Sequence, residues 1–504
     1  MICLGIDIGT TLTKASVYDS EQKNVRRIVL NPDQSETSLF GSRYAMPTAI
    51  YVSNDMTEFK IGTEAINLEL SPNGVVYRDF KMNLDYANKF VDKNQRISYC
   101  GLVAGILKYV YRLSLSQCEV SRFDKVVLTV PVSTPLNGIR EKLMREAAMR
   151  IGLEKIDIIK ESDAAGYALL KEDIHKNAKY LVYDFGGGTF DVSLIEVEDE
   201  QIGSIGAVGS DSRKRWGGIY IDNLIRNEWI RTDKTINTLA EKLRRPNTVP
   251  FRELFSIRKV LRDEPISAKI NLLRKESYKF PTGDYVITRR TLDDLSHNMV
   301  QATIDECIRL LEFHNVKVEE IDAVYLVGGS SRLKLVKKMW EDERKVRNAK
   351  FKLIDSAKLD VVSQGASLYN IYKISEERLI ELGKEKVRNG KYEEARLLFE
   401  KANDKGFVYL GLLYYSGVLG DYNYRKAFEC FKMQSDDAMA KLFGALMYFQ
   451  GLGVEKNDTK AYEILADDEF DDVYEALRRV LSARYTQSDL DLIYSINALN
   501  YIML

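Results

Sequence analysis

The sequence is poor in cysteine and in long apolar runs, and neither sign of charge dominates it. Its five cysteines are widely spaced and include no C-x-x-C pair, which argues against a disulfide framework or a structural zinc site. Lys and Arg number 73 against 74 Asp and Glu, so no overall basic field exists to hold nucleic acid or an anionic membrane. No secretory signal and no run of about 18 apolar residues is found. We therefore expect a cytoplasmic protein with neither nucleic-acid nor membrane partners.

The pattern of apolar and polar residues divides the 504 residues into two parts. Up to about residue 374, short β-branched runs such as Lys125–Val130 and Asp322–Val327 alternate with longer helical patterns, which is typical of an α/β domain with buried strands. After about Ser375 the pattern is helical throughout, with glycine at the turns. We expect an α/β domain over 1–374 and an all-α domain over 375–504.

The C-terminal part repeats itself. Ala395, Ala427 and Ala461 occupy similar settings, 32 and 34 residues apart. A period in the low thirties indicates stacked helix pairs, and small residues at fixed positions let antiparallel helices approach closely. The segment Tyr448–Val454 and the Asp-x-Lys-Ala that ends at Ala461 resemble Sel-one-type repeats, which are relatives of tetratricopeptide repeats. We expect a helical-repeat solenoid over about 376–465 and a terminal capping pair of helices over 472–504.

The first candidate site is a turn at the end of an N-terminal apolar strand. Asp7 closes the strand and is followed by Ile, Gly9, Thr10 and Thr11. A glycine followed by hydroxyls makes a tight hairpin whose backbone N–H groups can point at phosphate oxygens, and the Asp is left to hold hydrated Mg²⁺. On turn chemistry alone, an ordinary β-turn is the better explanation of this segment.

A second copy of this pattern strengthens the interpretation. Asp184 follows an apolar strand and precedes Phe, Gly186, Gly187, Gly188 and Thr189, and a second strand begins after that turn. The two Asp-x-Gly units lie 177 residues apart, as a duplicated domain with one hairpin in each half would place them. Three glycines in succession would weaken a sheet, so close approach of a ligand to the backbone is the economical explanation. Two facing hairpins predict a nucleotide cleft.

A third glycine-rich segment follows a buried strand near residue 327. Gly328, Gly329 and Ser330 lead into a helix, and Arg332 lies two residues further on. Glycines here let the backbone lie against a flat ring or a phosphate, and the Arg332 guanidinium can stack on a base. An ordinary strand-to-helix turn remains an alternative for this segment taken alone.

Together, in order and spacing, the three segments resemble the nucleotide-binding domain of the heat shock protein 70 family, within the actin-like ATPase superfamily. Phe80-Lys81 and the Ile159-Lys-Glu161 segment match further elements of that family. The resemblance covers about residues 1–374. It implies a duplicated actin-like ATPase fold with two ribonuclease H-like lobes, and it implies ATP or ADP with Mg²⁺ as ligands.

The resemblance also assigns roles to individual residues. Asp7 and Asp184 would hold Mg²⁺ through water, and Lys81 would face the γ-phosphate and orient the attacking water. Glu161 would help to position water or metal. Arg258 or Lys259 would oppose Arg332 across the adenine, although a solvated basic helix face explains these two residues almost as well. The residues expected to act in catalysis are Lys81, Glu161, Asp184 and Thr189. The residues expected to bind the nucleotide are Asp7, Gly9, Thr10, Thr11, Gly186, Gly187, Gly188, Thr189, Gly217, Gly218, Arg258, Lys259, Gly328, Gly329, Ser330 and Arg332.

The sequence also departs from the family pattern. Ile219 and Tyr220 replace an acidic pair, Ser162 replaces a proline, and neither the interdomain linker nor the peptide-binding β-sandwich and lid follows residue 374. We therefore expect an atypical chaperone-like enzyme that hydrolyses Mg-ATP slowly in an interlobe cleft. Its repeats would bind a protein partner, and nucleotide-exchange or co-chaperone proteins are further expected partners. The alternatives are a non-hydrolysing nucleotide-sensing scaffold or filament protein, and a small-molecule kinase of the same superfamily.

Overall fold

The computed structural model forms two compact units, Met1–Lys373 and Ile374–Leu504. Residues 373 and 374, at which the sequence predicts the change of domain, lie outside the described residues. The structure describes residues 1–34, 42–84, 90–91, 97–134, 138–169, 178–198, 201–209, 216–245, 249–355, 360–372, 375–420, 422–465, 472–481, 487–494 and 498–502.

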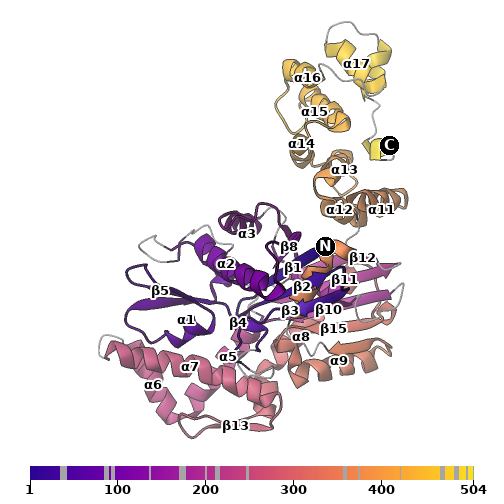
Figure 1. The fold of residues 1–504 in the computed structure, drawn as a ribbon. Helices are drawn as coiled ribbons and strands as arrows, with labels where there is room; N and C mark the ends of the chain where they lie inside the picture. The colour runs from indigo at the N-terminus through magenta and orange to yellow at the C-terminus, as the bar shows by residue number, and fades with distance from the viewer. Residues whose placement is uncertain are drawn as a thin grey trace. The chain divides into compact units, whose positions relative to one another are not determined.

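The first unit contains two sheets with the same strand order (Figure 1). The first sheet runs β3 (Asn24–Arg27), β2 (Leu12–Asp19), β1 (Ile2–Ile8), β8 (Lys125–Val130), β9 (Asp157–Lys160), with β4 (Ala45–Pro47) added beside β2. The second runs β12 (Gln201–Gly209), β11 (Phe190–Glu198), β10 (Ala178–Phe185), β15 (Ala323–Val327), β16 (Lys352–Asp355). In each sheet an antiparallel meander of three strands is extended by two parallel strands. This repetition is the duplicated α/β architecture that the sequence predicts.

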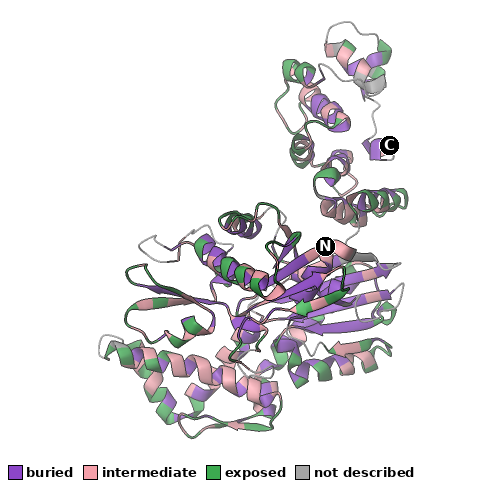
Figure 2. Ribbon diagram, viewed as in Figure 1, coloured by how far each residue is buried: buried purple, intermediate pink, exposed green. Residues whose placement is uncertain are grey.

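Helices separate and cover the two sheets. The helices α4 (Glu161–Leu169) and α10 (Val361–Tyr372) share one core with residues of both sheets, so they lie at the junction of the two lobes. The outer face of the first sheet packs on α2 (Tyr99–Cys118) and α3 (Ile139–Met149). The outer face of the second packs on α8 (Arg289–Phe313) and α9 (Lys334–Val346). Figure 2 shows that the central strands are buried along most of their length, which explains their nearly continuous apolar sequences.

Smaller elements complete both lobes. The first lobe adds a three-stranded sheet in the order β6 (Phe59–Ile61), β5 (Ala49–Ser53), β7 (Gly74–Arg78), together with α1 (Thr63–Asn67) and the 3-10 helix η1 (Phe80–Asn83). The second adds α5 (Gly218–Thr232), α6 (Lys234–Arg244), α7 (Phe251–Leu272), the hairpin of β13 (Ser277–Lys279) and β14 (Val286–Thr288), and the 3-10 helices η4 (Val318–Glu320) and η5 (Ser330–Arg332). No helix in the described part of the chain is long and apolar enough to cross a membrane.

The second unit is helical throughout its described residues, and consecutive helices pack on one another. Its helices are α11 (Glu376–Arg388), α12 (Tyr392–Lys401), α13 (Asn403–Ser416), α14 (Tyr424–Met433), α15 (Ala438–Gln450), α16 (Asp458–Leu465), α17 (Asp472–Leu481), α18 (Gln487–Tyr494) and α19 (Ala498–Ile502). The described residues of 472–504 thus form three helices, so the expected terminal pair of helices is wrong. The last of them, α19, packs back on α13, and Tyr501 contacts Phe443 edge-on.

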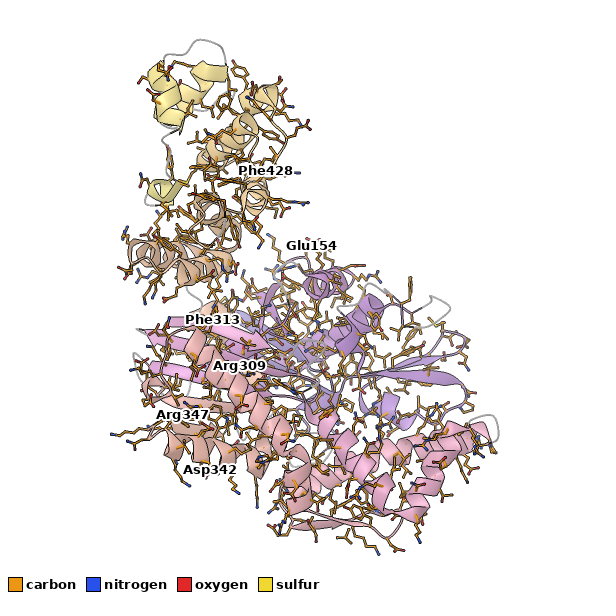
Figure 3. The ribbon with its side chains drawn as sticks, turned by 180° about the vertical axis from the view of Figure 1, so that it is seen from behind. Glu154, Arg309, Phe313, Asp342, Arg347 and Phe428 are labelled. Atoms are coloured by element: carbon orange, nitrogen blue, oxygen red, sulfur yellow. The ribbon has the colours of Figure 1, made fainter. Side chains whose placement is uncertain are left out.

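Two successive helix pairs repeat the same local contacts 34 residues apart. Gly417 and Gly451 both end a helix with a φ of 72°, where glycine avoids the steric cost of a side chain. The Asn423 side chain caps α14 and Asn457 caps the following α16, through bonds of 3.1 and 2.9 Å to a backbone N–H three residues on. Phe428, labelled in Figure 3, joins the two pairs through an edge-on contact of 5.2 Å with Tyr448. These contacts give a structural basis for the sequence period.

Candidate functional site

The first glycine turn joins β1 to β2. The Gly9 N–H donates to the Leu12 carbonyl at 3.1 Å, and a Cβ at Gly9 would lie only 2.5 Å from that oxygen. In the register of the hairpin, Asp7 lies directly opposite Lys14. Their side chains form an ion pair of 2.8 Å, and the Thr129 hydroxyl lies 3.4 Å from the other carboxylate oxygen of Asp7. The strand thus ends in a buried, paired carboxylate beside an open turn.

The second turn joins β10 to β11 with the same geometry. The Gly186 N–H donates to the Thr189 carbonyl at 3.0 Å, and Asp184 lies opposite Asp191 in the register. Each of these positions is 177 residues after its counterpart in the first hairpin. The two hairpins are therefore structural equivalents, one in each lobe.

The tips of the two hairpins face each other across the interlobe cleft. A Cβ at Gly187 would lie 2.4 Å from Thr11 Oγ1, and a Cβ at Gly188 would lie 2.6 Å from Thr10 Oγ1. Any side chain at these glycines would collide with the opposing threonines. The approach brings backbone N–H groups and hydroxyls from both lobes to one place, and such groups can surround an anion.

A buried ion pair lies between the lobes at the same site. Lys81, in η1, donates to Glu161 Oε1 at 2.5 Å, and both side chains are almost completely buried. Glu161 begins α4, the junction helix, so the pair links the first lobe to the interlobe core. Next to it, Ser162 receives a hydrogen bond of 2.5 Å from Ser193, which gives this departure from the family pattern a buried polar partner.

The predicted residues Gly217 and Gly218 pack against the backbone of the second hairpin. The Gly218 N–H donates to the Gly186 carbonyl at 3.0 Å, and a Cβ at Gly217 would lie 2.7 Å from the backbone of Gly188. Lys269 of α7 holds this segment by donating to the Gly218 carbonyl at 3.0 Å. These two glycines therefore lie outside the cavity lining, and the side chain that follows them in the lining is Ile219.

The third predicted segment closes the far side of the second hairpin. Gly328 has a φ of 87°, and a Cβ there would lie 2.6 Å from Asp184 Oδ1. The Ser330 hydroxyl donates to the Gly186 carbonyl at 2.8 Å. Arg332 is exposed at the edge of the cavity. The segment thus holds the base of the hairpin and leaves one guanidinium free to reach a ligand.

All three segments line one cavity of about 560 Å³, a size typical of small-molecule sites. The predicted residues in its lining are Asp7, Gly9, Thr10, Thr11, Lys81, Glu161, Asp184, Gly186, Gly187, Gly188, Thr189, Gly328, Gly329, Ser330 and Arg332. The sequence predictions and the geometry therefore meet at one place.

The prediction for the cationic residues of α7 needs correction. Arg258 is exposed and Lys259 pairs with Glu69 at 3.9 Å, and neither residue lines the cavity. The basic side chains that do line it from this segment are Arg262, Lys269 and Arg274. Arg274 just follows α7 and is exposed at the cavity, so it is the better candidate to face Arg332 across a flat ring. Sequence reasoning also missed Lys14, although its place opposite Asp7 follows once the hairpin register is known.

Three buried aspartates in and beside the cavity have shifted pKa values. Burial raises the pKa of Asp184 well above its usual range, and the charges of Glu161 and Asp191 add to the rise. Burial and Glu161 also raise the pKa of Asp191, to about 7. Burial would raise the pKa of Asp7 as well, but Lys14 and Lys81 lower it overall. The protein itself does not fully compensate the carboxylates of the second hairpin.

Among the described residues no three Asp, Glu, His or Cys side chains are placed to hold a metal ion together, so the arrangement fits a divalent cation only if the ion keeps waters of its own. Four buried carboxylates, Asp7, Glu161, Asp184 and Asp191, lie around two lysines in the described part of the site. Mg²⁺ favours carboxylate oxygens and keeps several of its own waters, and it is often shared with the phosphates of a ligand. A cation beside Asp184 would offset the burial and the neighbouring negative charges that raise the pKa of this carboxyl.

The raised pKa of Asp191 predicts a pH dependence of stability. Between its ordinary value of 3.8 and the value of about 7, the folded protein keeps a proton that the unfolded chain releases. The free energy of unfolding should therefore fall as the pH rises through this range. Asp191→Asn should remove this part of the fall, so chemical denaturation of both proteins in EDTA between pH 5 and 8 tests it. Equal pH slopes for the two proteins would contradict the prediction.

Comparison with known proteins identifies the family of the first unit. The family model described as "Hsp70 protein" matches residues 83–370, more than half of the chain. The chaperone protein DnaK of Thermosipho africanus (strain TCF52B) is 30% identical over 356 residues, which is 66% of this chain and 54% of that protein. The chain thus spans about half the length of the curated relative it matches. On the family match, its duplicated α/β unit is an Hsp70-type actin-like ATPase domain, and the chain belongs to the Hsp70 family.

Proposed function

We propose that this chain is an atypical chaperone-like ATPase that binds and slowly hydrolyses Mg-ATP between its two lobes. The observation that carries the proposal is the approach of the two equivalent glycine hairpins, with the buried Lys81–Glu161 pair beside them. Transfer of a phosphoryl group to water needs neutralised charge and a positioned nucleophile more than it needs covalent chemistry. The hairpins supply the first requirement and the ion pair the second.

Each residue of the cavity takes a role consistent with its place. The hairpin N–H groups and the hydroxyls of Thr10, Thr11 and Thr189 bind phosphate oxygens. Lys81 carries a buried positive charge toward the terminal phosphate and orients a water together with Glu161. Asp7 and Asp184 would hold Mg²⁺ through water, and the ion would supply further neutralisation of the phosphate charge. Arg332 and Arg274 flank the adenine.

The second part of the chain has a separate role in this proposal. We assign the nucleotide-binding domain to residues 1–374 and a helical-repeat module of the Sel-one or tetratricopeptide-like kind to 375–504. Stacked helix pairs commonly form surfaces that bind protein segments. The 34-residue recurrence of the turns at Gly417 and Gly451 supports this assignment. The module would bind a protein partner in place of a peptide-binding domain, and exchange factors or co-chaperones would act on the nucleotide-binding part.

The direct test is phosphate release from Mg-ATP by the full chain without added substrate. Asp184→Asn removes a carboxylate from the second hairpin and serves as the control for contaminating ATPase. Turnover that disappears in this variant supports the proposal. Tight ATP binding without turnover favours a nucleotide-sensing scaffold, because Ile219 lines the cavity where the family pattern has an acid. Turnover that requires a small-molecule acceptor favours a kinase.

A cluster of ion pairs at the edge of the cavity should hold the two lobes together and so slow the release of nucleotide. Arg262 of α7 donates to Glu69 Oε2 at 2.6 Å, and Arg78 lies 3.4 Å from the same carboxylate. Glu69 follows α1 of the first lobe, so Arg262 connects the two lobes across the cleft. Arg262→Gln should raise the dissociation rate of ADP by about two- to fivefold, as expected for a partly exposed pair.

Stopped-flow release of a fluorescent ADP measures this rate. Arg244→Gln is a suitable control, because Arg244 makes an exposed pair with Glu241 within α6 and does not line the cavity. An ADP release rate that does not change in Arg262→Gln would show that the cluster does not restrain the lobes.

A further inference from the structure

The charge pattern of the two hairpins differs at one pair of equivalent positions. Asp191 lies opposite Asp184 in the second hairpin, and its counterpart opposite Asp7 in the first hairpin is Lys14. The site therefore combines an acid–base pair in one lobe with an acid–acid pair in the other. Lys14 therefore offsets the charge of Asp7, whereas Asp191 adds to the negative charge around Asp184.

Lys14 is placed to reach a ligand as well as Asp7. Its ammonium lies 2.8 Å from Asp7 Oδ2, its side chain is 15% exposed, and it belongs to the cavity lining. A Cβ at Gly9 would lie 3.6 Å from Lys14 Nζ, so the ammonium lies against the glycine turn of the hairpin. The lysine ammonium has three donors and Asp7 takes one of them at this distance. Among the described residues no further hydrogen bond of this ammonium is seen, so the other two donors can reach an anion held by that turn.

We propose that Lys14 is a phosphate-binding residue that acts as a built-in cation, so that this site retains nucleotide without Mg²⁺. The inference rests on the proposed function, since it requires that the cavity binds a nucleotide. Lysine binds phosphate as a point charge, and in this site Lys14 and Lys81 come from different elements and both line the cavity. Each is paired with a carboxylate, Asp7 or Glu161, so together they bring two ammonium donors to the phosphates before any metal binds.

The test measures nucleotide affinity by calorimetry, with ADP and ATP, in Mg²⁺ and in EDTA. The wild-type chain should lose about tenfold or less in affinity when Mg²⁺ is removed. In EDTA, Lys14→Met should bind at least about tenfold more weakly than wild type, as expected for the loss of a hydrogen bond to a charged group. Lys14→Arg keeps the charge and should retain most of the Mg²⁺-independent affinity.

Two further variants guard against loss of folding and against nonspecific effects. Lys14→Met with Asp7→Asn removes both members of the ion pair, so no unpaired charge is left buried. This double variant should melt near the wild-type temperature and still bind weakly in EDTA. Lys345→Met removes an exposed lysine outside the cavity, which pairs with Asp342 at 3.7 Å, and should leave affinity unchanged.

The outcomes separate this inference from the proposed function. If Lys14→Met and the double variant both bind nucleotide in EDTA as tightly as the wild-type chain does, Lys14 has no role in phosphate binding. Nucleotide binding by the cavity would still stand. If the affinity of the wild-type chain for nucleotide falls by much more than about tenfold in EDTA, the inference about Lys14 is also wrong. If the wild-type chain binds neither ADP nor ATP even with Mg²⁺, the proposed function fails as well.

Discussion

Lys81→Met is expected to slow ATP turnover by about 10²- to 10³-fold, which is the typical cost of removing one preorganised charge or donor from a water-excluded site. Lys81 is 4% exposed and its ammonium is held by Glu161 at 2.5 Å. Its position is therefore fixed before a ligand arrives. Because the charge on the phosphoryl oxygens changes during transfer, this loss should affect turnover more than affinity. Single-turnover phosphate release together with the ATP dissociation constant separates the two effects.

The simple variant leaves Glu161 buried without its partner, which costs stability. Lys81→Met with Glu161→Gln removes both charges and should restore the melting temperature without restoring turnover. Lys345→Met is the matched control for the loss of a lysine. Turnover within about threefold of wild type in the double variant, well short of the loss expected for an essential donor, would remove Lys81 from the mechanism.

The parts of the site that the sequence predicts well are those fixed by short-range rules. A glycine turn at the end of a buried strand has few conformations, so Gly9 and Gly186 could be placed on equivalent hairpins from their spacing alone. The partner of each acid follows from the antiparallel register, which pairs Asp7 with Lys14 seven residues later. Lys14 was missed because its role depends on that register rather than on a motif.

The parts that were predicted wrongly depend on long-range packing. The helix α7 has 22 residues and carries basic residues on several turns. Which turn faces the cavity depends on where the helix docks, so sequence pattern favoured Arg258 and Lys259 while the structure brings Arg262, Lys269 and Arg274 to the lining. The number of helices predicted for 472–504 was wrong for a related reason. Its helices are short, and the last one, α19, is defined by its packing on α13.

The junction between the lobes also depends on a close backbone contact, at Gly365 of α10. A Cβ at this position would lie 1.5 Å from the carbonyl oxygen of Ala164 in α4, and 3.0 Å from the Ala168 nitrogen. On the other side of the same helix, a Cβ at Gly5 of β1 would lie 2.4 Å from the Ser363 carbonyl oxygen. The helix α10 therefore touches the backbone of two neighbours and cannot move away from one without pressing on the other.

Gly365→Ala is accordingly expected to destabilise the first unit by about 3 kcal/mol, at the upper end of the usual cost of overpacking. The contact is with backbone, so no side chain can rotate away to relieve it. The same displacement would move α4, which begins at Glu161, so nucleotide affinity should fall together with stability. Chemical denaturation and ADP calorimetry on the full chain measure the two effects.

Gly105→Ala provides the control for this prediction within the same unit. Gly105 lies within α2, and a Cβ there would meet only the flexible Cδ1 of Ile50, at 3.3 Å. Alanine favours a helix over glycine by about 1 kcal/mol, so this variant should be as stable as wild type or slightly more stable. If Gly365→Ala behaved in the same way, the backbone contact between α4 and α10 would not restrain the lobes. Destabilisation confined to Gly365→Ala, with weaker ADP binding, would instead show that the junction sets the geometry of the nucleotide site.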